Sequence, residues 1–165
     1  EEHDREHEWH NSTVAASVGA KALGEHRSVG LVRSGIRADV LQPDRGTKQL
    51  GKLMQYLAEV DVQGSLSIAE ALVETFPRLR RGSSCLILTP SLDRGWVRPA
   101  STLREAAIST QAVVIGSPVE TDERDRARRH ALLGEVAVAG IPSAYLSHDA
   151  RVEDLFRESA VATAS

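Results

Sequence analysis

The stretch that decides the fold is Ser83-Ser84-Cys85-Leu86-Ile87-Leu88-Thr89-Pro90-Ser91-Leu92. Its middle is an unbroken apolar run from Cys85 to Leu88, with Gly82 shortly before the run and the helix-breaking Pro90 after it. A strand without polar alternation is typical of a parallel sheet whose two faces are both covered by helices. The stretch therefore predicts the central strand of an α/β sheet.

Polar and aromatic residues follow this strand closely. Ligands of open α/β sheets bind just past the carboxyl ends of the strands, which is where Thr89, Ser91 and Asp93 stand. Trp96 comes a few residues later, and two roles are open for it. Its side chain either covers the end of the sheet or anchors a protein partner, because tryptophan is enriched at interaction hot spots.

Composition excludes several classes of protein. The chain has 165 residues, a formal net charge of -3, 41% hydrophobic, 26% charged and 4% aromatic residues. This balance fits one globular domain and argues against a nucleic-acid binder, which usually carries a basic stripe. A single cysteine rules out an internal disulfide and fits a reducing compartment. The sequence predicts no membrane span and no signal peptide, and it starts without Met, which suggests a piece of a longer protein.

Periodicity and capping signals place the other elements. Residues 1–10 are a charged stretch expected to be loop or a frayed extension, residues 11–158 are expected to form the domain, and residues 159–165 a disordered tail. Strands are expected at 28–32, 36–41, 112–115 and 143–146, and helices from about 11, 50, 67, 102, 121 and 152. Capping boxes are predicted at Ser67 with Glu70 and at Thr102 with Glu105. The order predicts an α/β, doubly wound, mostly parallel sheet with one antiparallel edge strand and helices on both faces.

Other reactive residues have structural interpretations that we favour. His3, His7 and His10 would share a helix face and suit a metal, but a charged chain end is more often solvated. Cys85 has the chemistry of a nucleophile, yet a thiol in the middle of an apolar strand is expected to be buried and inert, with a raised pKa.

A possible catalytic triad and a row of arginines also have structural interpretations that we favour. Ser91, His148 and Asp149 supply the residue types of a catalytic triad, but no Gly-x-Ser-x-Gly elbow surrounds the serine. Arg124, Arg126, Arg128 and Arg129 alternate with acidic residues, and this pattern favours a solvated helix surface over a phosphate site.

Several phrases, in this order, resemble the von Willebrand factor A-like domain. More narrowly, they resemble a bacterial family of unknown function that carries this domain behind a membrane anchor, often beside MoxR-type AAA+ ATPases. The likeness covers about residues 11–158. The phrases are Ser12-Thr13-Val14-Ala15-Ala16-Ser17, Val29-Gly30-Leu31-Val32, Leu41-Gln42-Pro43-Asp44-Arg45-Gly46, Gly64-Ser65-Leu66, Arg80-Arg81-Gly82-Ser83 and Leu88-Thr89-Pro90-Ser91-Leu92-Asp93.

The resemblance also shows what this chain lacks. Domains of this type commonly bind Mg²⁺ through an Asp-x-Ser-x-Ser loop after the first strand, a Thr, and an Asp after the fourth strand. The first strand and its loop are not in this sequence and are expected upstream of Glu1, Ser65 stands at the Thr position, and Pro90 stands near the Asp position. We therefore predict no functional metal site and no cofactor. The missing strand would leave a gap in the sheet, let residues 28–32 pair directly with the central strand, or be replaced by another chain.

The resemblance implies a non-catalytic protein-interaction domain with a degenerate metal site. It would lie on the cytoplasmic side of a membrane-anchored protein, work with a MoxR-type ATPase in complex assembly, and touch neither nucleic acid nor the membrane. The expected partner surface is Ser65, Thr89, Ser91, Asp93 and Trp96. One alternative is an Mg²⁺-dependent ligand-binding domain that uses Ser65 and Asp93. Another is a hydrolase that uses Ser91 or Cys85.

Overall fold

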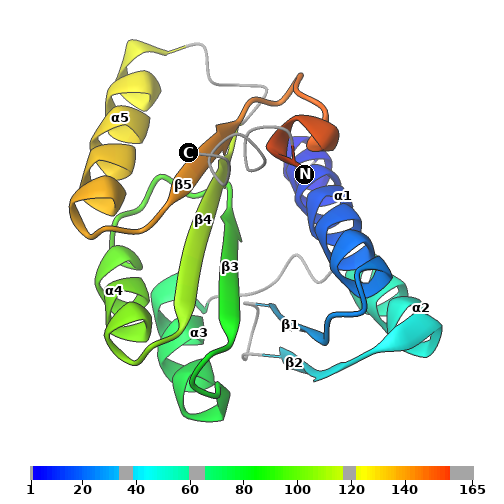
Figure 1. The fold of residues 1–165 in the computed structure, drawn as a ribbon. Helices are drawn as coiled ribbons and strands as arrows, with labels where there is room; N and C mark the ends of the chain where they lie inside the picture. The colour runs from blue at the N-terminus through cyan, green and yellow to red at the C-terminus, as the bar shows by residue number, and fades with distance from the viewer. Residues whose placement is uncertain (1, 34–38, 60–65, 117–121, 157–165) are drawn as a thin grey trace.

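The computed structural model describes residues 2–33, 39–59, 66–116 and 122–156 (Figure 1). Its helices are α1 (Glu2–Gly24), α2 (Gly46–Ala58), α3 (Ile68–Thr75), a short 3₁₀ helix η1 (Phe76–Arg78), α4 (Val97–Glu105) and α5 (Glu123–Val138). Residues 152–156 are also helical. The strands are β1 (Val29–Arg33), β2 (Asp39–Asp44), β3 (Ser84–Thr89), β4 (Ser109–Ile115) and β5 (Ser143–Leu146).

Three parallel strands form the main sheet in the order β3-β4-β5. The predicted central strand is confirmed as β3, and the two later strands are confirmed as β4 and β5. Ser84 of β3 is in register with Ser109 of β4, and Ala112 of β4 is in register with Ser143 of β5. The strand order follows the chain, so the reversal that defines a doubly wound sheet is not seen among the described strands.

Helices cover both faces of this sheet, as the unbroken apolar runs predict (Figure 1). On one face, Ala112 and Val114 of β4 pack with buried residues of α4 and α5. On the other face, Val113 and Ile115 of β4 pack against Val14 of α1. Successive residues from Ala112 to Ile115 therefore enter opposite cores, which explains why this half of β4 is apolar at every position.

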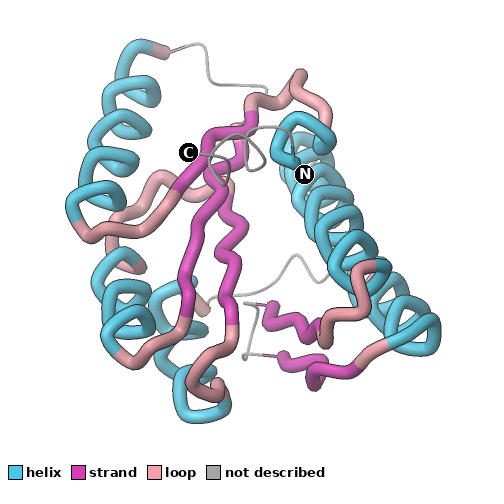
Figure 2. The backbone as a smooth tube through the Cα atoms, in the orientation of Figure 1, coloured by secondary structure: helices cyan, strands magenta, loops and turns pink. Residues whose placement is uncertain are grey.

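The antiparallel strands form a second sheet of their own, and the prediction of an antiparallel edge on the main sheet is wrong (Figure 2). β1 pairs with β2, with Leu31 opposite Leu41 and Arg33 opposite Asp39. The expected turn at Ser34 and Gly35 lies outside the described residues. Among the described strands, β3 pairs only with β4, so direct pairing between β1 and β3 is excluded.

Buried polar contacts attach the hairpin to α2. The Gln49 amide is 2% exposed, and its Nε2 donates to the carbonyls of Val29 at 2.7 Å and Gln42 at 2.9 Å. Both carbonyls belong to the hairpin region, so one glutamine holds its two sides against α2. A side chain buried in this way is tolerated because its donors are satisfied.

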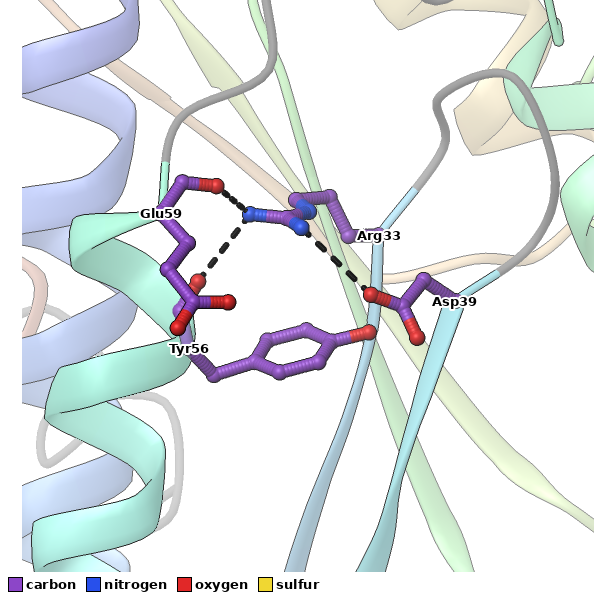
Figure 3. Close-up of polar contacts among 4 residues, drawn as sticks. All are labelled: Arg33, Asp39, Tyr56 and Glu59. Carbon is purple, nitrogen blue, oxygen red and sulfur yellow. Dashed lines mark hydrogen bonds and ion pairs between the residues drawn. The ribbon is translucent and has the colours of Figure 1, made fainter.

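A second contact joins the hairpin to the end of α2 (Figure 3). The Arg33 guanidinium donates to the Tyr56 carbonyl at 3.0 Å and to the Glu59 carbonyl. Carbonyls at the end of a helix have no partner within the helix, so these two need a donor from elsewhere. The guanidinium also pairs with Asp39 at 3.4 Å and lies 4.8 Å from the centre of the Tyr56 ring. Burial, followed by the nearby Asp39 carboxylate, raises the pKa of the Tyr56 phenol. Arg33 therefore caps α2 from another element.

The amino-terminal segment differs from expectation. Residues before Asn11 were expected to form a loop, and that prediction is wrong because α1 begins at Glu2. Asn11 and Ser12 lie inside this helix and do not begin it. The segment contains no proline or glycine, so nothing in the backbone prevents the helix from extending backwards. Across the described ranges, no helix combines the length and apolar character that crossing a bilayer requires.

Candidate functional site

The loop that follows β3 contains most of the predicted site residues. The Thr89 hydroxyl accepts from the Ser91 N–H at 2.9 Å, and the Ser91 hydroxyl accepts from the Asp93 N–H at 3.1 Å. The Asp93 carboxylate in turn accepts from the Gly95 N–H at 3.2 Å. Each polar side chain thus satisfies a backbone donor two residues further along, a pattern typical of Asx and Ser/Thr turns. The three side chains determine the shape of the loop.

These residues differ sharply in exposure. Thr89 is 0% exposed and contributes only to the interior of the loop. Ser91 and Asp93 are exposed and are available to a partner. Ser65, the remaining polar member of the predicted surface, lies outside the described residues. The structure therefore brings Thr89, Ser91 and Asp93 into one loop, and it presents the last two at its surface.

Trp96 is 1% exposed and belongs to the core beside Ile87 and Val97. Of its two roles, covering the end of the sheet is the one that this position fulfils. Its Nε1–H is buried without a hydrogen-bond partner. A side chain in this position supports the loop from beneath and does not reach a partner itself.

The Mg²⁺ alternative depends on Ser65 and Asp93 acting together. A hard cation of this kind needs several oxygen ligands in near-octahedral geometry. No group of three or more His, Cys, Asp or Glu side chains within the described ranges is placed to hold a metal ion. Since Ser65 lies outside those ranges, the alternative stays a prediction.

The residue types of a triad do not assemble at this loop. β4 lies between β3, which leads to Ser91, and β5, which leads to His148, so the two strands are about 10 Å apart. The His148 ring packs instead against His10 of α1, with 5.3 Å between ring centroids. The Ser91 hydroxyl accepts the Asp93 N–H. This arrangement does not place a base beside the serine, as a triad requires.

The contact between His10 and His148 was not predicted. It requires α1 to extend back past Asn11, into a segment whose charged composition predicts loop. The side chains of His3 and His7 lie outside the described part, so their use as metal ligands stays a prediction. Residues 2–10 carry no apolar period, so the one sequence signal for placing His10 on α1 is that the segment contains no proline or glycine to end the helix.

Cys85 and the arginines of α5 behave as the structural interpretations expect. Burial raises the pKa of the Cys85 thiol, which disfavours the reactive thiolate. On α5, Arg128 pairs with Asp125 at 3.5 Å, and the guanidinium of Arg129 lies 4.2 Å from the centre of the Tyr145 ring. These contacts are those of an exposed helix surface with mixed charges.

A hollow that the sequence did not indicate lies at the amino end of β3 and β4. It has a volume of about 420 Å³, and Phe76, Pro77 and Ile108 are among its lining residues. Arg81 and Glu105 also line it. It is far from the loop after β3, because the amino and carboxyl ends of the parallel strands lie at opposite edges of the sheet.

Comparison with known proteins adds no family assignment. No protein-family model matches this chain, and no curated protein matches it either.

Proposed function

We propose that this chain is a non-catalytic protein-interaction domain that binds a protein partner through the surface of the loop after β3. The observation that supports it most is the arrangement of Ser91 and Asp93, whose side chains stay exposed while they hold the loop in a fixed conformation. A fixed loop loses little conformational entropy on binding, so more of the contact energy appears as affinity. Trp96 beneath the loop adds to this rigidity.

The resemblance to the von Willebrand factor A-like domain suggests which partner to test first. Members of the bacterial family with this domain often occur beside MoxR-type AAA+ ATPases, and we propose such an ATPase as the partner. The same resemblance suggests a degenerate metal site and a place on the cytoplasmic side of a membrane-anchored protein. Neither Cys85 nor Ser91 is proposed as a nucleophile.

The experiment compares recovery of a purified MoxR-type ATPase on immobilised wild-type and variant chains. Ser91→Arg puts a bulky charge at the loop surface, and Asp93→Asn removes a charge while keeping an oxygen that accepts the Gly95 N–H. Glu105→Gln is the matched control, because it removes one exposed carboxylate at the opposite edge of the sheet. We expect about a tenfold loss of affinity for Ser91→Arg, as for a hot-spot contact.

Asp93→Asn should weaken binding of the ATPase less than Ser91→Arg does, and the Glu105→Gln variant should bind as wild type does. Equal recovery with all three variants would remove this loop as the interaction surface. A calorimetric titration with Mg²⁺ checks the alternative: a saturable site that Asp93→Asn abolishes would replace our proposal with a metal-dependent one.

A further inference from the structure

Histidines of two distant segments meet beside the carboxyl edge of the parallel sheet. His10 of α1 and His148, two residues after the end of β5, pack with 5.3 Å between their ring centroids and 53° between their ring planes. Both residues are half-buried. Figure 1 shows the first half of α1 beside the segment that follows β5. The contact therefore joins a helix to the sheet that this helix covers.

Core packing one helical turn away holds these two rings near each other. Val14, four residues after His10 on α1, is buried in one core with Leu146, the last residue of β5. Residues four apart lie on the same face of a helix, so His10 and Val14 share a face. The two histidines therefore continue the contact between α1 and β5 beyond its apolar part, and the core beside them fixes their separation.

The face of α1 that packs on the sheet changes from apolar residues to histidines toward its amino end. Val18 and Val14 belong to the apolar part of this face. Steps of four, three and four residues back from Val14 reach His10, His7 and His3, all within α1. Of His3 and His7 only the backbone positions are described. Two histidines one turn apart on a helix face are a known arrangement for binding one zinc ion.

The distance between the two described rings suits coordination of a shared ion. Zinc holds imidazole nitrogens at about 2.0–2.1 Å in tetrahedral sites, and a ring centre lies about 1.1 Å behind its nitrogen, so two ligating rings have centres roughly 5 Å apart. The rings of His10 and His148 are 5.3 Å apart. Aromatic rings in plain contact span about 4.5–7 Å, so the distance alone does not distinguish the two cases. The position of His7, one turn before His10, adds the ligand that a plain ring pair lacks.

We propose that His7, His10 and His148 form a binding site for a divalent transition metal such as Zn²⁺, which ties the first half of α1 to the segment after β5. Three imidazoles with water in the fourth position are an established zinc coordination set. The side chains of two of these histidines are described, which agrees with the absence of a group of three metal ligands within the described part. The site differs from the Mg²⁺ alternative, because imidazole suits transition metals whereas carboxylate and water suit Mg²⁺.

The test is calorimetric titration of the full chain with Zn²⁺ in a buffer that does not bind metal. We expect saturable binding of a single ion by the wild-type chain. His7→Ala, His10→Ala and His148→Ala should each weaken binding by about tenfold or more, because even the outer partners of metal ligands are worth roughly 10–100-fold in affinity. His130→Ala, at an exposed histidine of α5, is the matched control and should bind Zn²⁺ as wild type does.

A second measurement on the wild-type chain separates a lost ligand from a lost fold. In NMR spectra, Zn²⁺ should shift the imidazole resonances of His7, His10 and His148 together. The resonances of His26 and His130 should stay where they are. Zn²⁺ should also raise the temperature of thermal unfolding, because an ion that binds the folded chain more tightly than the unfolded one stabilises the fold.

Several results would overturn the proposal. Absence of saturable zinc binding would remove the site. Unchanged affinity in His148→Ala would mean that the histidines of α1 bind zinc without the sheet, and an equal loss in His130→Ala would mean that zinc binds scattered surface histidines. Displacement of Zn²⁺ by an excess of Mg²⁺ would assign the ion to oxygen ligands instead of imidazoles.

Discussion

The most demanding single residue in this chain is Trp96. Its ring is packed in the core, yet its Nε1–H is buried without a hydrogen-bond partner. Burying an unpaired donor costs roughly 1–3 kcal/mol, while burying the ring contributes more. The residue is therefore stabilising through its area and destabilising through one polar atom, and the two contributions can be separated by mutation.

We predict that Trp96→Ala lowers the free energy of unfolding by about 3–5 kcal/mol, as for other large core truncations. Trp96→Phe removes the unpaired N–H together with part of the ring, so its cost should be about 1 kcal/mol or less. Denaturant unfolding followed by circular dichroism measures both. A loss for Trp96→Phe that approaches the loss for Trp96→Ala would contradict the assignment of the N–H as a destabilising atom.

Cys85 gives a prediction about pH. Because burial raises the pKa of its thiol in the folded state, the unfolded state releases the proton first as pH rises. The contribution of the protonated Cys85 thiol to the free energy of unfolding is fully present below the ordinary thiol pKa of about 8.5. It is lost as pH rises toward the folded-state pKa. Cys85→Ala should therefore flatten the fall in unfolding free energy between about pH 7 and 9.5, below the range in which free tyrosine titrates. An unchanged slope in the variant would contradict this account.

At the scale of elements, local signals predict well only where the local sequence decides the outcome. The capping box at Ser67 is confirmed: its hydroxyl accepts from the Glu70 N–H, and the Glu70 carboxylate accepts from the Ser67 N–H at 2.8 Å. Thr102 and Glu105 have the same spacing but lie inside α4, where the Thr102 hydroxyl donates to the Arg98 carbonyl. The predicted second box is wrong because the helix begins five residues earlier, at Val97.

The packing of α1 on α2 depends on a glycine. A Cβ placed on Gly19 would collide with the Leu53 side chain, which is 1% exposed. Gly51 of α2 offers a matched comparison, because a Cβ there meets nothing within 4 Å. The same substitution at the two positions therefore separates helix propensity from helix packing.

We predict that Gly51→Ala raises the free energy of unfolding by about 0.5–1 kcal/mol, since alanine favours the helix. Gly19→Ala gains the same propensity but forces Leu53 out of its place, at a cost of roughly 1–3 kcal/mol, so the net effect is destabilising. Thermal and denaturant unfolding of the two variants measures the difference. Stabilisation by Gly19→Ala would mean that the helices separate without cost.

For the whole molecule, the sequence predicts the strands better than their assembly. Every described strand was expected, because apolar runs and glycine or proline boundaries are local. Which strands pair is decided by contacts between distant residues, such as Gln49 with Val29 and Arg33 with Tyr56. The sequence of β1 does not predict that this strand pairs with β2 and packs on α2 instead of pairing with β3. The sequence predicts the loop after β3 because its position follows from one strand, whereas the burial of Trp96 depends on the packing of several elements, which the local sequence does not determine.

The hairpin of β1 and β2 forms one packing unit with α2, and Arg33 makes several of the polar contacts within that unit, to Tyr56, Glu59 and Asp39. We predict that Arg33→Met speeds amide exchange in β1, β2 and the last turn of α2 by about tenfold, while exchange in β4 stays unchanged. Arg104→Met is the matched control, because Arg104 donates to the Ala139 carbonyl at the end of α5 at 2.8 Å, on the other side of the molecule. That variant should affect the end of α5 and leave the hairpin unchanged. Faster exchange in β4 with Arg33→Met would show that both sheets unfold as one cooperative unit, because opening of the hairpin would then require opening of the parallel sheet.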